Sequence, residues 1–93
     1  MFFVPRVNVV ESDSGYSVEV LGRTGIKYRE GEKSMFVDSE VLSPGKGIQI
    51  FTRSIKAWDA PNQNEPVGPE KRLAIVKNIK DAIQFQNQRI VVD

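Results

Sequence analysis

Apolar and polar residues alternate at a period of two through much of the first half of the chain. The alternation covers residues 16–21, 26–29, 34–42 and 48–52, and a valine-rich stretch precedes it at residues 6–10. A period of two sends successive side chains to opposite faces, so these stretches are predicted to be strands with one buried face. On this pattern Met35 and Val37 face one way, while Phe36 and Asp38 face the other.

Turn-forming residues separate these stretches. Gly, Ser, Asp, Glu and Pro gather at residues 12–15, 22–25, 30–33 and 43–47. Glycine tolerates backbone angles that other residues avoid, and short turns of this kind join neighbouring antiparallel strands. The first half is therefore predicted to form an antiparallel meander of about five to six strands.

The second half changes to a helical pattern after a corner and a loop. Ile55 and Trp58 lie three apart, which suits a tight helical turn or a corner, and the proline-rich residues 61–69 are predicted to form a surface loop. Pro69 suits the first position of a helix, where its missing N–H costs nothing. Apolar residues then recur at spacings of three and four, which predicts an amphipathic helix of roughly 17 residues. Its apolar side comprises Leu73, Ile75, Val76, Ile79, Ala82 and Ile83, with Phe85 packing inward near the end.

Asn87 is predicted to end this helix, and residues 89–92 are predicted to form a last short strand. The sequence therefore predicts one α+β domain over residues 1–93. It is a curved antiparallel β-meander of about five to six strands with one long C-terminal amphipathic helix packed on it, followed by a short terminal strand. The oligomeric state stays open, because the terminal strand could pair inside the sheet or form an exposed edge.

The composition excludes several classes of chemistry. The 93 residues contain no Cys and no His, which removes thiol nucleophiles, Cys/His zinc sites and Ser-His-Asp triads. No glycine-rich phosphate-binding motif is present, and no cofactor is predicted. The formal net charge is only +1, so we expect no strong overall field for nucleic acid or membrane. The lack of Cys and of a leader-like or membrane-spanning apolar stretch favours a soluble protein of the cytoplasm.

Acidic residues gather around the predicted strand at 34–42. Asp38 and Glu40 share one face of it, and Glu30 and Glu32 flank the glycine of the preceding turn. Residues 1–45 carry five basic and seven acidic residues (net −2), whereas residues 46–93 carry eight and five (net +3). Three interpretations stay open: a solvated strand face, a carboxylate pair for a divalent cation or acid–base catalysis, and an acidic rim that meets a basic protein.

Aromatic residues beside basic ones point to another kind of partner. Lys27 and Arg29 flank Tyr28, and further Lys and Arg residues lie near Phe51. Sheets that bind single-stranded nucleic acid stack bases on exposed rings beside such cations, which gives an alternative function. Most of the rings are instead expected in the core. Phe36 and Phe51 are the exceptions, because they lie opposite the main apolar side.

Two segments resemble the signature of the immunity protein 74 family, a family of small bacterial antitoxins of polymorphic toxin systems. They read YREGEKSMFVDSEVL at residues 28–42 and SIKAWDAP at residues 54–61. A helix carrying Ile75 and Asn78-Ile79 and a terminal IVV at residues 90–92 continue the resemblance. It covers the chain from about Tyr16 to the end.

The resemblance implies a non-enzymatic protein that binds and neutralises the C-terminal toxin domain of a large secreted effector, as in contact-dependent growth inhibition. It implies a 1:1 complex with the cognate toxin domain, often a nuclease such as an RNase acting on tRNA, whose active site is occluded. The toxin-contact residues that the two segments imply are Glu30, Glu32, Asp38, Glu40 and Asp59. Trp58 could be an anchor at the interface or a core residue at the corner, and the core is favoured. The layout also resembles Whirly-type single-stranded-DNA-binding domains, a similarity of fold alone.

Overall fold

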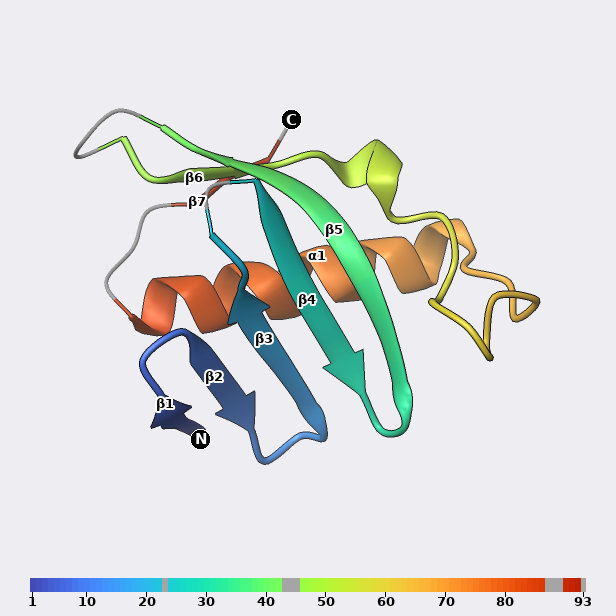
Figure 1. Ribbon diagram of the computed structural model, residues 1–93, viewed down its shortest axis with the longest axis horizontal. Coiled ribbons are helices and arrows are strands. Elements are labelled where there is room, and N and C mark those ends of the chain that lie inside the picture. The colour runs from blue at the N-terminus through green and yellow to red at the C-terminus, as the bar shows by residue number, and fades with distance from the viewer. Residues whose placement is uncertain (23, 43–45, 87–89, 93) are drawn as a thin grey trace.

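Seven strands follow one another across a single curved sheet in the order of the chain (Figure 1). The computed structural model describes residues 1–22, 24–42, 46–86 and 90–92. The strands are β1 (Phe2–Arg6), β2 (Val9–Ser12), β3 (Tyr16–Val20), β4 (Gly25–Glu30), β5 (Lys33–Val41), β6 (Ile48–Ile50) and β7 (Ile90–Val92). Neighbouring strands are antiparallel except β6 and β7, which run parallel because helix α1 (Pro69–Phe85) crosses between them. The predicted α+β architecture is confirmed.

The hairpin formed by β4 and β5 fixes which side chains share a face. Its two-residue turn contains Gly31, whose φ of 62° lies in the left-handed region that glycine tolerates. The register places Tyr28 opposite Met35 and Lys27 opposite Phe36. Tyr28 and Met35 lie on the side that packs against α1, and we call this the inner face of the sheet. The side that carries Lys27 and Phe36 is the outer face.

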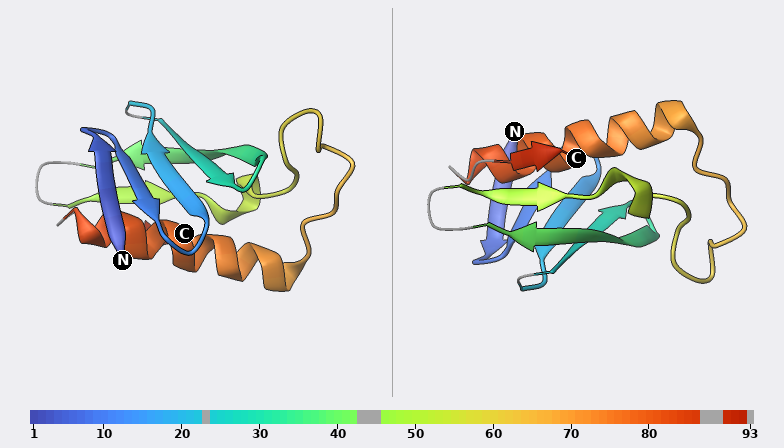
Figure 2. Two further views of the ribbon diagram at one scale, coloured as in Figure 1. Left: turned by 90° about the horizontal axis from the view of Figure 1, so that it is seen from below. Right: turned by 90° about the horizontal axis from the view of Figure 1, so that it is seen from above.

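Helix α1 lies along the inner face, as the two views perpendicular to Figure 1 show (Figure 2). It has Gly68 as its N-cap and Pro69 at its first position, and it spans 17 residues as predicted. It buries Ile75, Ile79, Ala82 and Ile83, which recur at close to 3.6 residues per turn. Among the described residues, no helix is long and apolar enough to cross a membrane.

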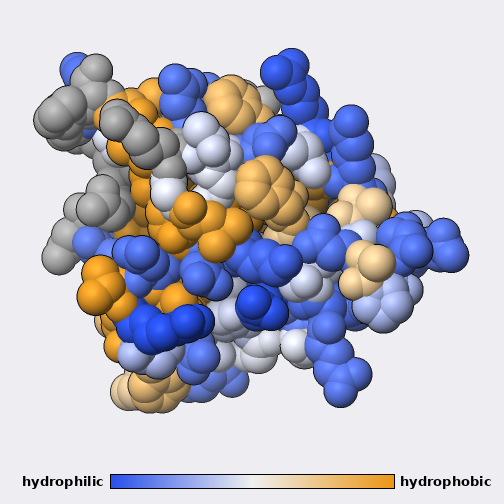
Figure 3. Space-filling model, in the orientation of Figure 1, coloured by the Kyte–Doolittle hydropathy of each residue, from blue (hydrophilic) through white to orange (hydrophobic). Residues whose placement is uncertain are grey.

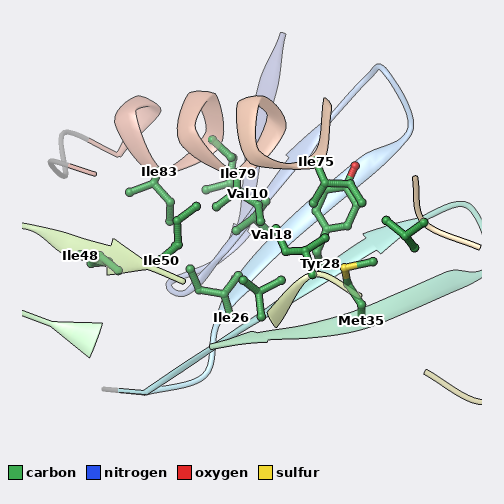
Figure 4. Packing of buried hydrophobic residues seen from close by; sticks show 14 of the residues in the cluster. Val10, Val18, Ile26, Tyr28, Met35, Ile48, Ile50, Ile75, Ile79 and Ile83 are labelled. Carbon is green, nitrogen blue, oxygen red and sulfur yellow. The ribbon is translucent and has the colours of Figure 1, made fainter. Parts of the chain in front are cut away.

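The core fills the space between α1 and the inner face (Figure 4). Ile75, Ile79 and Ile83 point from the helix toward side chains of the sheet. Tyr28 is fully buried, and its ring stacks on that of Trp58 with the centroids 6.3 Å apart. Trp58 is only 3% exposed, so its predicted place in the core is confirmed.

The predicted corner also lies where the chain leaves the sheet. The short 3-10 helix η1 (Thr52–Ser54) follows β6, and buried Ile55 comes directly after it. The proline-rich stretch beyond Trp58 is mostly exposed, with Val67 as its buried anchor. Ile55 and Trp58, the two large apolar residues of the predicted corner, are thus both buried where the chain leaves β6.

The N-terminal stretch differs from its prediction. Residues 6–10 were expected to form one strand, but the chain turns at Val7 and Asn8, between β1 and β2. The turn brings Arg6 opposite Val9, and the register shifts between Phe3 and Arg6, a segment that contains Pro5. The prediction was wrong because Val7 lies in the turn with Asn8, so that only Val9 and Val10 of this stretch belong to β2.

Two apolar residues predicted to pack inward from the helix do not lie in the core. Leu73 is 70% exposed and Phe85 is 48% exposed. Each is two residues, about 200° around the helix, from a buried isoleucine (Ile75 and Ile83), so each side chain points away from the buried face. The Phe85 ring instead packs near that of Phe2 on β1, with the two ring centroids 5.1 Å apart. The predicted helix end at Asn87 and parts of the predicted turns at 22–25 and 43–47 lie outside the described residues.

Candidate functional site

The outer face of β5 carries three consecutive outward side chains of distinct chemistry. Phe36, Asp38 and Glu40 are exposed, whereas the two residues between them, Val37 and Ser39, are buried. The carboxylates of Asp38 and Glu40 form no ion pair and no side-chain hydrogen bond with any described residue. Figure 3, viewed from the side where β3, β4 and β5 lie in front of α1, shows apolar areas among hydrophilic ones on this face. In the part of the chain that the structure describes, the face therefore offers unpaired negative charge beside an aromatic ring.

Backbone contacts hold Asp38 rigidly in the sheet. Its N–H donates to Ser54 Oγ at 3.0 Å, and its carbonyl accepts the N–H of Phe51 at 3.0 Å. On the other side it pairs with Gly25 of β4. A Cβ atom at Gly25 would come within 2.3 Å of Phe36 Cε2, so the Phe36 ring lies directly on the glycine backbone. Because glycine has no side chain, the space over Gly25 is filled by the Phe36 ring, which therefore lies beside Asp38.

Asp59 lies beside this face but already has a cationic partner. Lys27 Nζ donates to Asp59 Oδ2 at 3.1 Å, and the Asp59 N–H donates to the carbonyl of Ser34 on β5 at 2.7 Å. The two charged side chains are 27% and 40% exposed. The ion pair neutralises Lys27, the cross-strand neighbour of Phe36, and so does not leave this lysine to pair with Asp38.

Glu30 belongs to the inner face, where it joins the sheet to the helix. Tyr28 Oη donates to Glu30 Oε1 at 2.6 Å, Asn78 Nδ2 donates to Tyr28 Oη at 2.9 Å, and Lys71 of α1 pairs with the same carboxylate. Partial burial acts to raise the pKa of Glu30, but the hydrogen bonds from Lys71 and Tyr28 and the charges of Lys71 and Lys33 outweigh it. The pKa therefore lies below its ordinary value.

The opposite shift occurs at Tyr28. Burial and then the hydrogen bond to Glu30 raise the pKa of the Tyr28 hydroxyl well above its ordinary range, although the hydrogen bond from Asn78 acts to lower it. The hydroxyl therefore stays protonated and bridges the side-chain amide of Asn78 on α1 to the carboxylate of Glu30 on β4. This arrangement is suited to holding α1 on the sheet.

Among the described residues, no group of three His, Cys, Asp or Glu side chains is arranged to hold a metal ion. The family model for immunity protein 74 matches residues 17–93. The chain belongs to the immunity protein 74 family. No curated protein and no solved structure matches it. Membership suggests a non-enzymatic immunity protein that binds a cognate polymorphic toxin.

The immunity protein 74 match runs from β3 to the end and includes every residue predicted to contact a toxin. Asp38 and Glu40 lie together on the outer face, and Asp59 lies beside Ser34 at the edge of the same strand. Glu32 is exposed at the turn between β4 and β5. Glu30 is separated from them, because it points to the inner face. Whether any of the five contacts a toxin stays a prediction.

Sequence reasoning missed two features of this immunity protein 74 chain. One is the packing of the Phe36 ring on Gly25, and the other is the pairing of Asp38 with Phe51. Each contact links residues from separate segments of the chain, and no local pattern encodes such pairs. The inner position of Glu30 did have a signal. It continues the period-two series of Ile26 and Tyr28, both of which are fully buried.

Proposed function

We propose that this immunity protein neutralises a nuclease toxin domain by covering its active site with the outer face of β5. The observation that carries the proposal is the pair of exposed carboxylates, Asp38 and Glu40, without a cationic partner among the described residues. A nuclease binds the phosphate backbone through a basic cleft, and carboxylates on a rigid strand are complementary to such a cleft. The complex forms in the cytoplasm, as one immunity protein to one toxin domain.

The size of the molecule is compatible with a tight complex. A stable interface buries about 800 Å² on each partner. The accessible surface of this chain is 5832 Å², so one face can supply that area and leave the rest in solvent. Because α1 covers the inner face, the outer face is the part of the sheet that is free to meet a partner over several strands.

The test is co-expression with the toxin domain encoded by the neighbouring upstream gene. A tagged wild-type chain is expected to co-purify with that domain and to restore growth. The double variant Asp38→Asn/Glu40→Gln removes two charges with little change in shape and is expected to weaken binding by at least about tenfold. Glu70→Gln/Asp81→Asn is the matched control, because it removes two carboxylates from α1, which lies against the opposite face of the sheet.

The outcomes separate the parts of the proposal. Absence of a complex and of growth rescue with the wild-type chain would contradict the immunity function for this pair. Rescue with equal affinity for the wild type and both double variants would leave the immunity function standing and reject Asp38 and Glu40 as contacts. A complex in which the toxin still degrades nucleic acid would reject occlusion of its active site.

Binding of single-stranded nucleic acid is a second candidate, favoured by the two rings on the outer face. Phe36 is 45% exposed, Phe51 is half-buried, and the Arg53 guanidinium lies 6.0 Å from the Phe51 ring centroid. Base stacking on such rings gives binding that falls steeply with salt. Titration of a labelled oligonucleotide at low and high salt tests this candidate, and lack of binding at low salt rejects it.

A further inference from the structure

We propose that Phe36, Asp38 and Phe51 form a receptor for one arginine side chain of the toxin domain. The inference rests on the proposed immunity function and names the chemistry of the group that the outer face of β5 binds. The incoming guanidinium would lie on the ring of Phe36 and pair with the carboxylate of Asp38, with Phe51 as the opposite wall.

The strand register brings the three side chains together. Phe36 and Asp38 are two residues apart on β5 and therefore share the outer face. Phe51 continues the extended backbone of β6, and its N–H donates to the carbonyl of Asp38 at 3.0 Å, so it lies directly across from Asp38. Side chains directly opposite on one face have Cβ atoms about 4.5–5.5 Å apart. The carboxylate thus has an aromatic ring beside it on its own strand and another across from it.

Gly25 fixes the ring of Phe36 before any partner arrives. Since a Cβ atom at Gly25 would lie within 2.5 Å of both Phe36 Cε2 and Cζ, the ring packs against bare backbone on one side. It nevertheless stays 45% exposed, so another part of the ring faces solvent. A ring that is already ordered loses little side-chain entropy when it binds, which favours affinity. This geometry is typical of an anchor residue at an interface.

The charged side chains described around Asp38 do not pair with it, so its cationic partner is expected to come from the toxin domain. Lys27, the cross-strand neighbour of Phe36, is paired with Asp59 at 3.1 Å. Arg53 lies over the ring of Phe51 and forms no ion pair with Asp38, although both side chains are exposed. Asp38 therefore has no cation among the described residues. A nearby aromatic face and a free carboxylate together match a guanidinium, which stacks flat and donates a planar fork of hydrogen bonds.

The experiment measures the affinity of the upstream-encoded toxin domain for the full chain and its variants. Phe36→Leu keeps an apolar side chain but removes the ring, and Asp38→Asn keeps the shape but removes the charge. Each is expected to weaken binding by about tenfold. Leu73→Ala, which truncates an exposed apolar residue on α1, is the control and is expected to bind as the wild type does. Circular dichroism establishes that each variant is folded, and the near-isosteric Asp38→Asn keeps the test valid should Phe36→Leu unfold.

Arginine is tested from the other side of the complex. Each arginine of the toxin domain is replaced by lysine, and the affinity is measured against wild type and Phe36→Leu. One Arg→Lys variant is expected to lose about as much affinity as Phe36→Leu does, with little further loss when the two are combined. Additive losses for every arginine would overturn the receptor.

Two other results would also overturn the inference. Full affinity of Phe36→Leu and Asp38→Asn in a complex that still protects cells would reject the receptor while the immunity function stands. An oligonucleotide that binds the wild type and not Phe36→Leu would assign the rings to bases. If the wild-type chain neither binds the toxin domain nor protects cells, the proposed function fails, and the receptor fails with it.

Discussion

The two faces of strand β5 differ in how completely their side chains are matched by the rest of the molecule. On the inner face, Met35 and Val37 are fully buried, and no buried side-chain nitrogen or oxygen among the described residues lacks a hydrogen-bond partner. On the outer face, Phe36 is 45% exposed, and the charges of Asp38 and Glu40 are not paired with any residue that the structure describes. One strand thus contributes to stability on one side, and on the other side it carries the residues that we propose to contact the toxin. Substitutions on the two faces should therefore have separable effects.

The largest effect on stability is expected in the core beneath the sheet. Ile79→Ala removes a fully buried side chain and should lower the free energy of unfolding by about 2–5 kcal/mol. Leu73→Ala, on the same helix but 70% exposed, should change it by less than about 0.5 kcal/mol. Urea denaturation followed by circular dichroism measures both. Similar losses for the two variants would contradict the position of α1.

A smaller loss is expected when the hydroxyl that joins helix and sheet is removed. Tyr28→Phe deletes the group that donates to Glu30 and accepts from Asn78, and should cost about 1–2 kcal/mol of unfolding free energy. Because the two bonds form one network, Asn78→Ala should cost less in the Tyr28→Phe background than in the wild type. A double-mutant cycle measures this coupling. Full additivity would show that the network contributes nothing as a unit.

Acid should weaken the same junction through Glu30. Its pKa is lower in the folded chain than the ordinary value of 4.5, so its stabilising contribution is fully present above pH 4.5 and is lost as the pH falls through the folded-state pKa. The loss should be smaller than that of Tyr28→Phe, since solvent partly screens the ion pair. Denaturation measured from pH 7 to pH 3 tests this sign. Glu30→Gln should be less stable than the wild type at pH 7 and should lose less of its stability on acidification.

A small effect on stability, together with a loss of affinity, is expected on the outer face at Gly25. In Gly25→Ala the new methyl group displaces the Phe36 ring, but the ring is partly exposed and can rotate, so we expect a change of at most about 1.5 kcal/mol. Affinity for the toxin domain should nevertheless fall as it does for Phe36→Leu. Calorimetric titration of Gly25→Ala and of Gly25→Ala/Phe36→Leu compares them. Wild-type affinity in Gly25→Ala would show that the position of the ring is irrelevant.

The sequence was sufficient to predict features that depend on neighbouring residues. The period of two placed Phe36, Asp38 and Glu40 on one face, and the spacing from Pro69 onward located the helix with its full length. Both patterns are local and repeat over several residues, so single exceptions did not obscure them.

Features that join distant positions could not be predicted in this way. Lys27 meets Asp59 across 32 positions, and Asn78 meets Tyr28 across 50. Such contacts depend on the curvature of the sheet and on the path of the loop, which no short window contains. Glu30 is an intermediate case. Its face followed from alternation, but its charge suggested a place in the acidic rim.

The outermost strands bear on how the molecule behaves at high concentration. An open sheet edge can recruit further strands and so start aggregation. β1 contains Pro5, which has no amide N–H to donate, within the segment where its register shifts, and β7 at the other edge spans three residues in the part of the chain that the structure describes. Neither edge is a good template for an added strand. The described edges therefore do not favour polymerisation of the chain through its own sheet.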